Sequence, residues 1–187
     1  MRSFGYHNQF LPRSHITKPE IEQAIAAALY KSRQNLRNRL QPWKSKVDST
    51  KGKSYQKIFV ILSIMSRPSK IRLFVKRGVS DTDLPLERIP SAISTRGQHQ
   101  LRSRSNPGAT PLSFSKRKDV DDFVQTQWAV LAPDFELVEG KPIPHRDLEP
   151  EAVPPFTSMA RAEAGGHGQV FRTETHPDHY TFGRAQV

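Results

Sequence analysis

The chain has no cysteine among its 187 residues. This excludes disulfide bridges, thiolate metal ligands and a cysteine nucleophile, and it is typical of proteins from reducing compartments. Long apolar runs are also missing, because the longest, Ile58–Met65, is interrupted by Ser63 and is far shorter than the roughly 20 residues of a membrane span. The N-terminus, Met1–Phe10, lacks the apolar core of a signal peptide. We expect an intracellular protein, cytoplasmic or nuclear, that does not bind membranes.

Acidic residues are scarce in the first two thirds of the chain. Residues 1–60 carry 12 lysines and arginines against 3 acidic residues, and residues 61–120 carry 12 against 4. Residues 121–187 reverse the balance with 5 against 11, which leaves a net charge of +11. The basic part can attract the acidic part, bind an anionic partner such as nucleic acid, or form a solvated surface.

Apolar periodicity predicts helices in the N-terminal half. An apolar residue recurs every three or four positions from Ile21 to Leu40, behind a helix-start signal at Thr17–Glu20, and predicts an amphipathic helix of about twenty residues. A second helix beginning near Ser54 is apolar nearly all round and is expected to be buried. A short third helix is expected to start with Ser69 as its cap and to end at Gly78.

The remaining segments contain fewer periodic patterns, and 15 prolines are spread along the whole chain. We predict a mainly α fold: an N-terminal helical module, a substantial irregular linker and an incomplete β-hairpin at the C-terminus. The expected segments are a disordered tail at residues 1–16, a basic helical module at 17–89, a flexible linker at 90–117, a helix at 118–133, an irregular segment at 134–158 and a hairpin within 159–187.

A glycine cluster near the C-terminus is the strongest functional motif. Gly165, Gly166 and Gly168 surround His167 and are followed by Val170. Glycines let backbone N–H groups approach phosphate oxygens, and a valine two residues on is typical of the kinase loop that packs against adenine. Spacing alone does not distinguish this loop from an ordinary flexible turn. A Walker A loop is excluded because no Lys-Ser/Thr follows the last glycine.

Two other motifs are weaker. The tetrapeptide His145-Arg146-Asp147-Leu148 spells a kinase catalytic loop, but Ala152 stands where that loop needs a metal-binding asparagine. His176-Pro177-Asp178-His179 gathers two imidazoles and a carboxylate, but no distant third ligand is evident, so we expect a surface turn. Trp43 and Trp128 are interpreted as packing residues. We therefore assign no catalytic and no metal-binding residue.

Several segments together resemble the N-terminal region of fungal serine/threonine protein kinase-like proteins. The matching segments, in chain order, are Lys57–Leu62, Gly78–Leu86, Phe123–Phe135, Pro155–Phe156, Gly165–Phe171 and Thr175–His179. The resemblance implies that residues 159–187 are the truncated start of a kinase domain, with its first two strands. It also implies that the glycines and His167 form the ATP-binding loop, with Val170 against the adenine.

The resemblance has departures that matter for activity. Glu163 stands in place of the first glycine of the loop, and no lysine occurs after Lys141 to act as the kinase lysine. ATP and Mg²⁺ are therefore implied by the resemblance, but we expect this chain alone to be catalytically inactive and to bind neither tightly. The alternative hypothesis is a basic helical module that binds a protein partner or nucleic acid.

Overall fold

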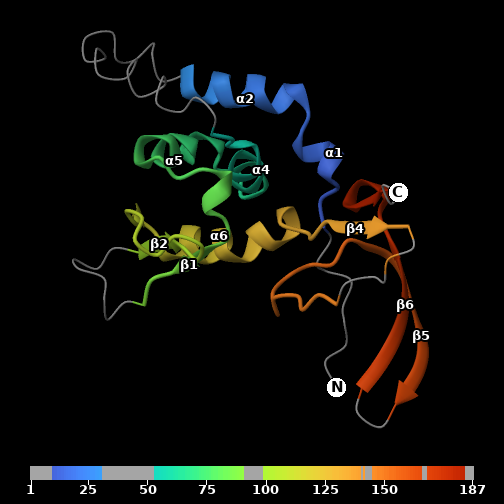
Figure 1. Cartoon of the computed structure of the whole chain (residues 1–187). Coiled ribbons are helices and arrows are strands. Elements are labelled where there is room, and N and C mark those ends of the chain that lie inside the picture. Colours follow the sequence, from blue (N-terminus) through green and yellow to red (C-terminus); the bar gives the residue numbers. More distant parts are fainter. Residues whose placement is uncertain are drawn as a thin grey trace, which may run out of the picture. The chain divides into compact units, whose positions relative to one another are not determined.

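The computed structural model of the protein describes residues 10–30, 53–90, 99–139, 141, 145–165 and 168–183 (Figure 1). The chain divides into two compact units. We call residues 16–127 the core unit, and residues 1–15 together with 128–187 the hairpin unit. The described residues form helices and small sheets of two or three strands, so the fold is of mixed content and the prediction of a mainly α protein is not confirmed.

The core unit begins with helices and continues with a small sheet. Its elements, in order, are α2 (Pro19–Tyr30), α4 (Gln56–Ile64), η1 (Pro68–Lys70), α5 (Ile71–Arg77), η2 (Asp81–Asp83), β1 (Leu86–Arg88), β2 (His99–Ser103), β3 (Leu112–Phe114) and most of α6 (Arg117–Val130). None of the described helices is long and apolar enough to cross a membrane.

Helix α4 lies at the centre of the core unit. Five consecutive residues, Ile58 to Leu62, are buried, which confirms the prediction of a helix enclosed on nearly all sides. Its first turn is capped from a distance: both carboxylate oxygens of Asp81 accept backbone N–H groups, from Lys57 at 3.1 Å and from Ile58 at 3.0 Å. These hydrogen bonds satisfy donors that a helix start otherwise leaves unpaired.

The ends of the predicted helices are correct in part. Gly78 ends α5 with a left-handed φ of 72°, as predicted. The prediction of Ser69 as the cap of that helix is wrong, because Ser69 lies inside η1 and the residue before α5 is Lys70. Helix α2 is described only to Tyr30, so the second half of the predicted first helix and Trp43 lie outside the described residues.

Two strands of a three-stranded antiparallel sheet, β2 and β3, lie within the predicted linker. The strand order is β1-β2-β3, and the inward side chains Leu101, Leu112 and Phe114 are buried. The prediction of a flexible linker is therefore wrong for residues 99–117, while residues 91–98 lie outside the described part. Each strand holds only one or two buried apolar residues, too few for alternation to be recognised in the sequence.

An aromatic cluster joins the sheet to two helices. The ring of Phe74 on α5 stacks on Phe123 of α6 at 5.3 Å and meets Phe114 of β3 edge-on at 6.3 Å. Offset and edge-to-face aromatic pairs contribute energy beyond the area that they bury. The cluster therefore holds α5, α6 and β3 together as one core.

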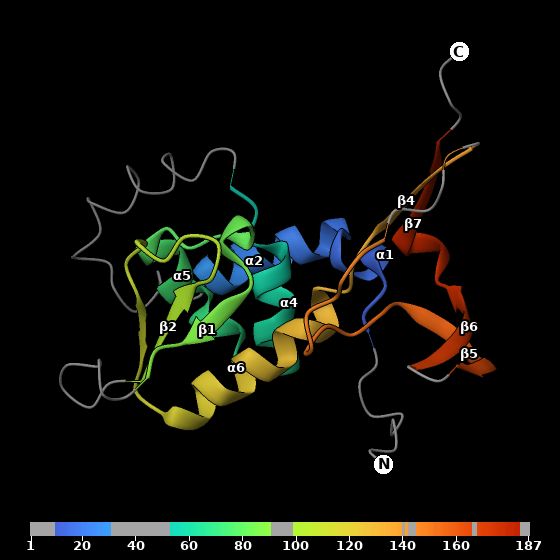
Figure 2. The ribbon, with the colours of Figure 1, turned by 60° about the horizontal axis from the view of Figure 1, so that its bottom comes forward.

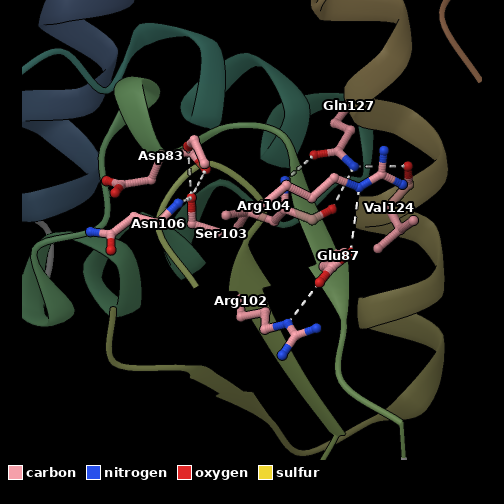
Figure 3. Close-up of polar contacts among 10 residues, drawn as sticks. Asp83, Glu87, Arg102, Ser103, Arg104, Asn106, Val124 and Gln127 are labelled. Atoms are coloured by element: carbon pink, nitrogen blue, oxygen red, sulfur yellow. Dashed lines mark hydrogen bonds and ion pairs between the residues drawn. The ribbon is translucent and has the colours of Figure 1, made fainter. Parts of the chain in front are cut away.

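Strand β1 lies beside α6 (Figure 2), and a buried amide joins the two (Figure 3). Gln127 is fully buried; its Oε1 accepts the N–H of Leu86, and its Nε2 donates to the carbonyl of Leu86, both at 2.8 Å. Nε2 also lies 3.2 Å from the carbonyl oxygen of Val124. The side chain thus pairs with β1 as a neighbouring strand would.

The hairpin unit holds two two-stranded sheets. Its elements are α1 (Arg13–Ile16, of which Ile16 belongs to the core unit), the last residues of α6, β4 (Phe135–Val138), β5 (Phe156–Gly165), β6 (Gly168–Thr175), η4 (Pro177–His179) and β7 (Tyr180–Gly183). Strands β5 and β6 are antiparallel, whereas β4 and β7 pair in parallel. Figure 1 shows β5 and β6 as a long paired ribbon.

Two predicted segments are corrected in this unit. Residues 10–16 are not a disordered tail, because they include α1 and make defined contacts; residues 1–9 lie outside the described part. Residues 134–158 are not wholly irregular, because β4 lies within them and β5 begins at Phe156. The parallel partner of β4 is more than 40 residues away in the sequence, which no local pattern could indicate.

Candidate phosphate-binding hairpin

The glycine cluster lies at the tip of the β5–β6 hairpin. The register pairs Gly165 with Gly168, so that the strands meet immediately beside the two intervening residues. Those residues, Gly166 and His167, lie outside the described part of the chain. The structure therefore brings the ends of the predicted glycine loop together across an antiparallel turn.

The side chain of Val170 is open to solvent next to this tip. Val170 is 59% exposed, and its neighbour Phe171 is 39% exposed. Adjacent residues of a strand point to opposite faces, so each face of the hairpin carries an uncovered apolar side chain. A register shift between Arg161 and Glu163 bends the ladder just before the tip. The described part of the hairpin thus presents one uncovered apolar side chain on each face, close to Gly168.

The other end of the hairpin is closed by the His176–His179 turn. The backbone N–H of His176 donates to the carbonyl of Pro155 at 2.8 Å, one residue before β5 begins. Within the turn, the N–H of His179 donates to the carbonyl of His176 at 2.9 Å, and the N–H of Asp178 donates to Nδ1 of His176 at 3.2 Å. We call this closed end the root of the hairpin.

His179 is buried, although the other residues of the predicted surface turn are exposed or partly exposed. Its side chain is only 3% exposed, and Nδ1 lies 3.1 Å from Oδ1 of Asp134. Neither ring nitrogen has a hydrogen-bond partner among the described residues. No group of three histidine, aspartate or glutamate side chains within the described ranges is placed to hold a metal ion.

Asp178 is the polar centre of the turn. Hydrogen bonds from the side chain and backbone of Ser14 lower the pKa of the Asp178 carboxyl, and the charges of His176 and His179 act in the same direction, while partial burial opposes them. The backbone N–H of Ser14 lies 3.1 Å from Oδ2 of Asp178. Sequence reasoning missed this contact because the two residues are 164 positions apart.

The remaining candidate motifs do not join the hairpin tip. His145 and Asp147 contact one another at 3.1 Å, and both side chains are almost completely exposed. Arg146 donates to the backbone carbonyl of Asp134 at 2.7 Å, which is a structural contact. Trp128 is buried at the end of α6, as expected of a packing residue.

Comparisons with known proteins do not assign the chain to a family. No family model, curated protein or solved structure matches it.

Proposed function

We propose that the β5–β6 hairpin is the phosphate-covering hairpin of a protein kinase-like nucleotide site. Gly165, Gly166, His167 and Gly168 cover the phosphates of ATP, and Val170 packs against the adenine. The observation that carries the proposal is the register, because pairing of Gly165 with Gly168 turns the glycine cluster into the tip of an antiparallel hairpin. Backbone N–H groups in such a tip can approach phosphate oxygens without obstruction by side chains.

Nucleotide binding by this chain alone is expected to be weak. Val170 is largely open to solvent, so an adenine placed against it buries one side only. No lysine follows Lys141 in the sequence to pair with the phosphates. Phosphoryl transfer requires Mg²⁺, a phosphate-binding lysine and a catalytic aspartate together, and bound Mg²⁺ would neutralise the phosphate charge. We therefore propose a kinase-related hairpin without kinase activity in this chain by itself.

An NMR titration with Mg-ATP tests this function. Because we expect millimolar affinity, amide shifts are followed up to about 10 mM nucleotide. The amides of Gly165, Gly168 and Val170 should shift together, and the substitution Gly168→Val should abolish the response by blocking approach to the backbone. Gly108→Val is the control, since Gly108 lies in the core unit. Unmoved tip amides in the wild-type chain would overturn the proposal, and micromolar binding would contradict the expected weakness.

A second function is favoured by the charge of the core unit. Residues 16–127 hold 22 lysines and arginines against 9 aspartates and glutamates. Such an excess attracts polyanions and releases their counterions on binding. The alternative proposal is therefore that the core unit docks nucleic acid or an acidic protein. Filter binding to DNA and RNA over a salt series should show an affinity that falls steeply with salt, and no binding at low salt would exclude nucleic acid.

A further inference from the structure

The N-terminal segment Phe10–Ser14 contacts the turn at the root of the hairpin. The ring of Phe10 lies edge-on to both imidazoles, at 5.6 Å from His176 and 5.5 Å from His179. At the other end of the segment, the N–H of Ser14 donates to the carboxylate of Asp178 at 3.1 Å. One short turn therefore receives both an aromatic and a polar contact from a segment more than 160 residues away.

The same segment is attached to the chain before β4. The N–H of Leu11 donates to the carbonyl of Ala129 at 2.7 Å, and Nη1 of Arg13 lies 3.7 Å from Oδ2 of Asp134. The other oxygen of Asp134 faces His179. The segment therefore contacts Ala129 and Asp134 as well as the turn, so several contacts along its length hold it in place.

The turn that receives these contacts lies directly beside the register pair at the root of the two strands. Its first residue, His176, bonds to Pro155, and the next register pair inward is Phe156 with Thr175. The ring of Phe156 also stacks on Phe135 of β4 at 6.4 Å. An isolated two-stranded hairpin is marginally stable in water. Whether β5 and β6 stay paired therefore depends on the contacts that hold their root.

We propose that Phe10–Ser14 is a strap that fixes the His176–His179 turn and thereby controls how rigidly the glycine tip is held. The inference rests on the proposed function, because it concerns the regulation of the same hairpin. With the strap attached, the strands stay paired and the tip is pre-organised for phosphates. With the strap released, the root opens and the hairpin frays, which lowers the population able to bind.

Hydrogen exchange followed by mass spectrometry tests the strap on the whole chain. Phe10→Ala removes the ring from both imidazoles, and Asp178→Asn weakens the bond to Ser14. Phe10→Ala should speed exchange of the β5 and β6 amides on the order of tenfold, the effect expected for losing an aromatic contact. Asp178→Asn should speed it by a smaller factor, because solvent screens the partly exposed carboxylate. Exchange of α4 should stay unchanged and shows that the core unit remains folded.

Matched controls remove the same groups where they do not touch the strap. Glu174→Gln neutralises a carboxylate on the exposed surface of β6, and Phe182→Ala removes a ring that is 66% exposed. Both should leave hairpin exchange at the wild-type rate. Unchanged exchange in Phe10→Ala and Asp178→Asn, or equal acceleration in the controls, would overturn the strap.

The exchange experiment needs no nucleotide, so its failure is separable from that of the proposed function. Faster exchange in the strap variants together with unmoved tip amides in the Mg-ATP titration supports the strap and removes the phosphate site. Tip amides that shift with Mg-ATP while exchange is insensitive to the strap variants leave the phosphate site standing and remove the strap.

Discussion

The two units of the chain differ in how completely they bury their apolar side chains. Of the 21 buried apolar residues among those described, 18 lie in the core unit and three, Trp128, Val130 and Val153, lie in the hairpin unit. Exposed large apolar residues show the opposite distribution: Ile64 belongs to the core unit, and Met159, Val170, Phe171, Tyr180 and Phe182 belong to the hairpin unit. The core unit therefore encloses its own core, while the hairpin unit presents apolar surface to solvent.

The buried residues that stabilise the chain therefore lie mostly in the core unit, whereas the residues that suggest a chemical function lie in the hairpin unit. Apolar surface and unpaired strand edges are costly to expose and are characteristic of surfaces that bind something. The glycine tip and Val170 lie in the hairpin unit, where packing is sparse. Substitutions in the two units should therefore have different consequences, and their comparison tests the division.

The largest expected effect is that of removing the aromatic centre of the core unit. Phe74 is fully buried against Phe114 and Phe123, so Phe74→Ala should lower the free energy of unfolding by about 3–5 kcal/mol. The matched change Phe171→Ala, at an exposed site in the hairpin unit, should cost less than about 1 kcal/mol. Urea denaturation followed by far-ultraviolet circular dichroism measures both. Equal losses would show that the units do not differ in packing.

A buried polar contact should have the next largest effect. Gln127→Leu leaves the N–H and carbonyl of the buried Leu86 without their partner, and we expect a loss of about 2–4 kcal/mol. Gln125→Leu is the control, because Gln125 is exposed on the same helix. Urea midpoints of the two variants give the comparison. A Gln127→Leu protein as stable as the control would mean that the hydrogen bonds between Gln127 and Leu86 do not stabilise the position of β1.

The sequence predicted the helices of the core unit well and its sheet poorly. Helix α4 was recognisable because its apolar residues are consecutive, and the end of α5 because Gly78 supplies the left-handed conformation locally. Strand β1 is three residues long and is aligned by Gln127, 41 positions away. Such an alignment depends on tertiary contacts that no local pattern contains.

The candidate site, too, could be predicted from the sequence only in part. The turn between Gly165 and Gly168 could be predicted because glycine spacing is a local property, and the register agrees with it. The burial of His179 at the hairpin root could not be predicted, because the His-Pro-Asp-His sequence alone indicated a surface turn. Two residues that contact His179, Phe10 and Asp134, lie far away in the sequence and carry no motif of their own.

A glycine substitution tests the backbone of the core unit with a smaller effect. Gly78→Ala forces a side chain into a left-handed conformation, which should cost about 1–2 kcal/mol. Space is not the cause, because an added Cβ would come no closer than 3.8 Å to Nζ of Lys53. Gly108→Ala is the control, with similar room at 3.9 Å and no positive φ, and should change stability by less than about 0.5 kcal/mol. Thermal unfolding of both variants checks the difference.

The smallest expected effect is a pH dependence confined to the hairpin unit. The pKa of Asp178 is lowered in the folded chain, so its contribution is present above the ordinary aspartate pKa and is lost as pH falls through the folded value. Hairpin stability of the wild type relative to Asp178→Asn should be greatest above about pH 4, the ordinary aspartate pKa, where the carboxylate is ionised in both the folded and the unfolded chain. The difference should disappear in stronger acid.

The pH dependence can be measured from the NMR intensities of paired β5 and β6 amides during thermal unfolding at each pH. His176 and His179 are the charged groups that act on the carboxylate of Asp178, and the measurement compares Asp178→Asn with the control Glu174→Gln, which removes a carboxylate elsewhere on the hairpin. The effect should be small because Asp178 is partly exposed and solvent screens its charge. A difference that persists unchanged into strong acid would show that the charge on Asp178 does not hold the strap.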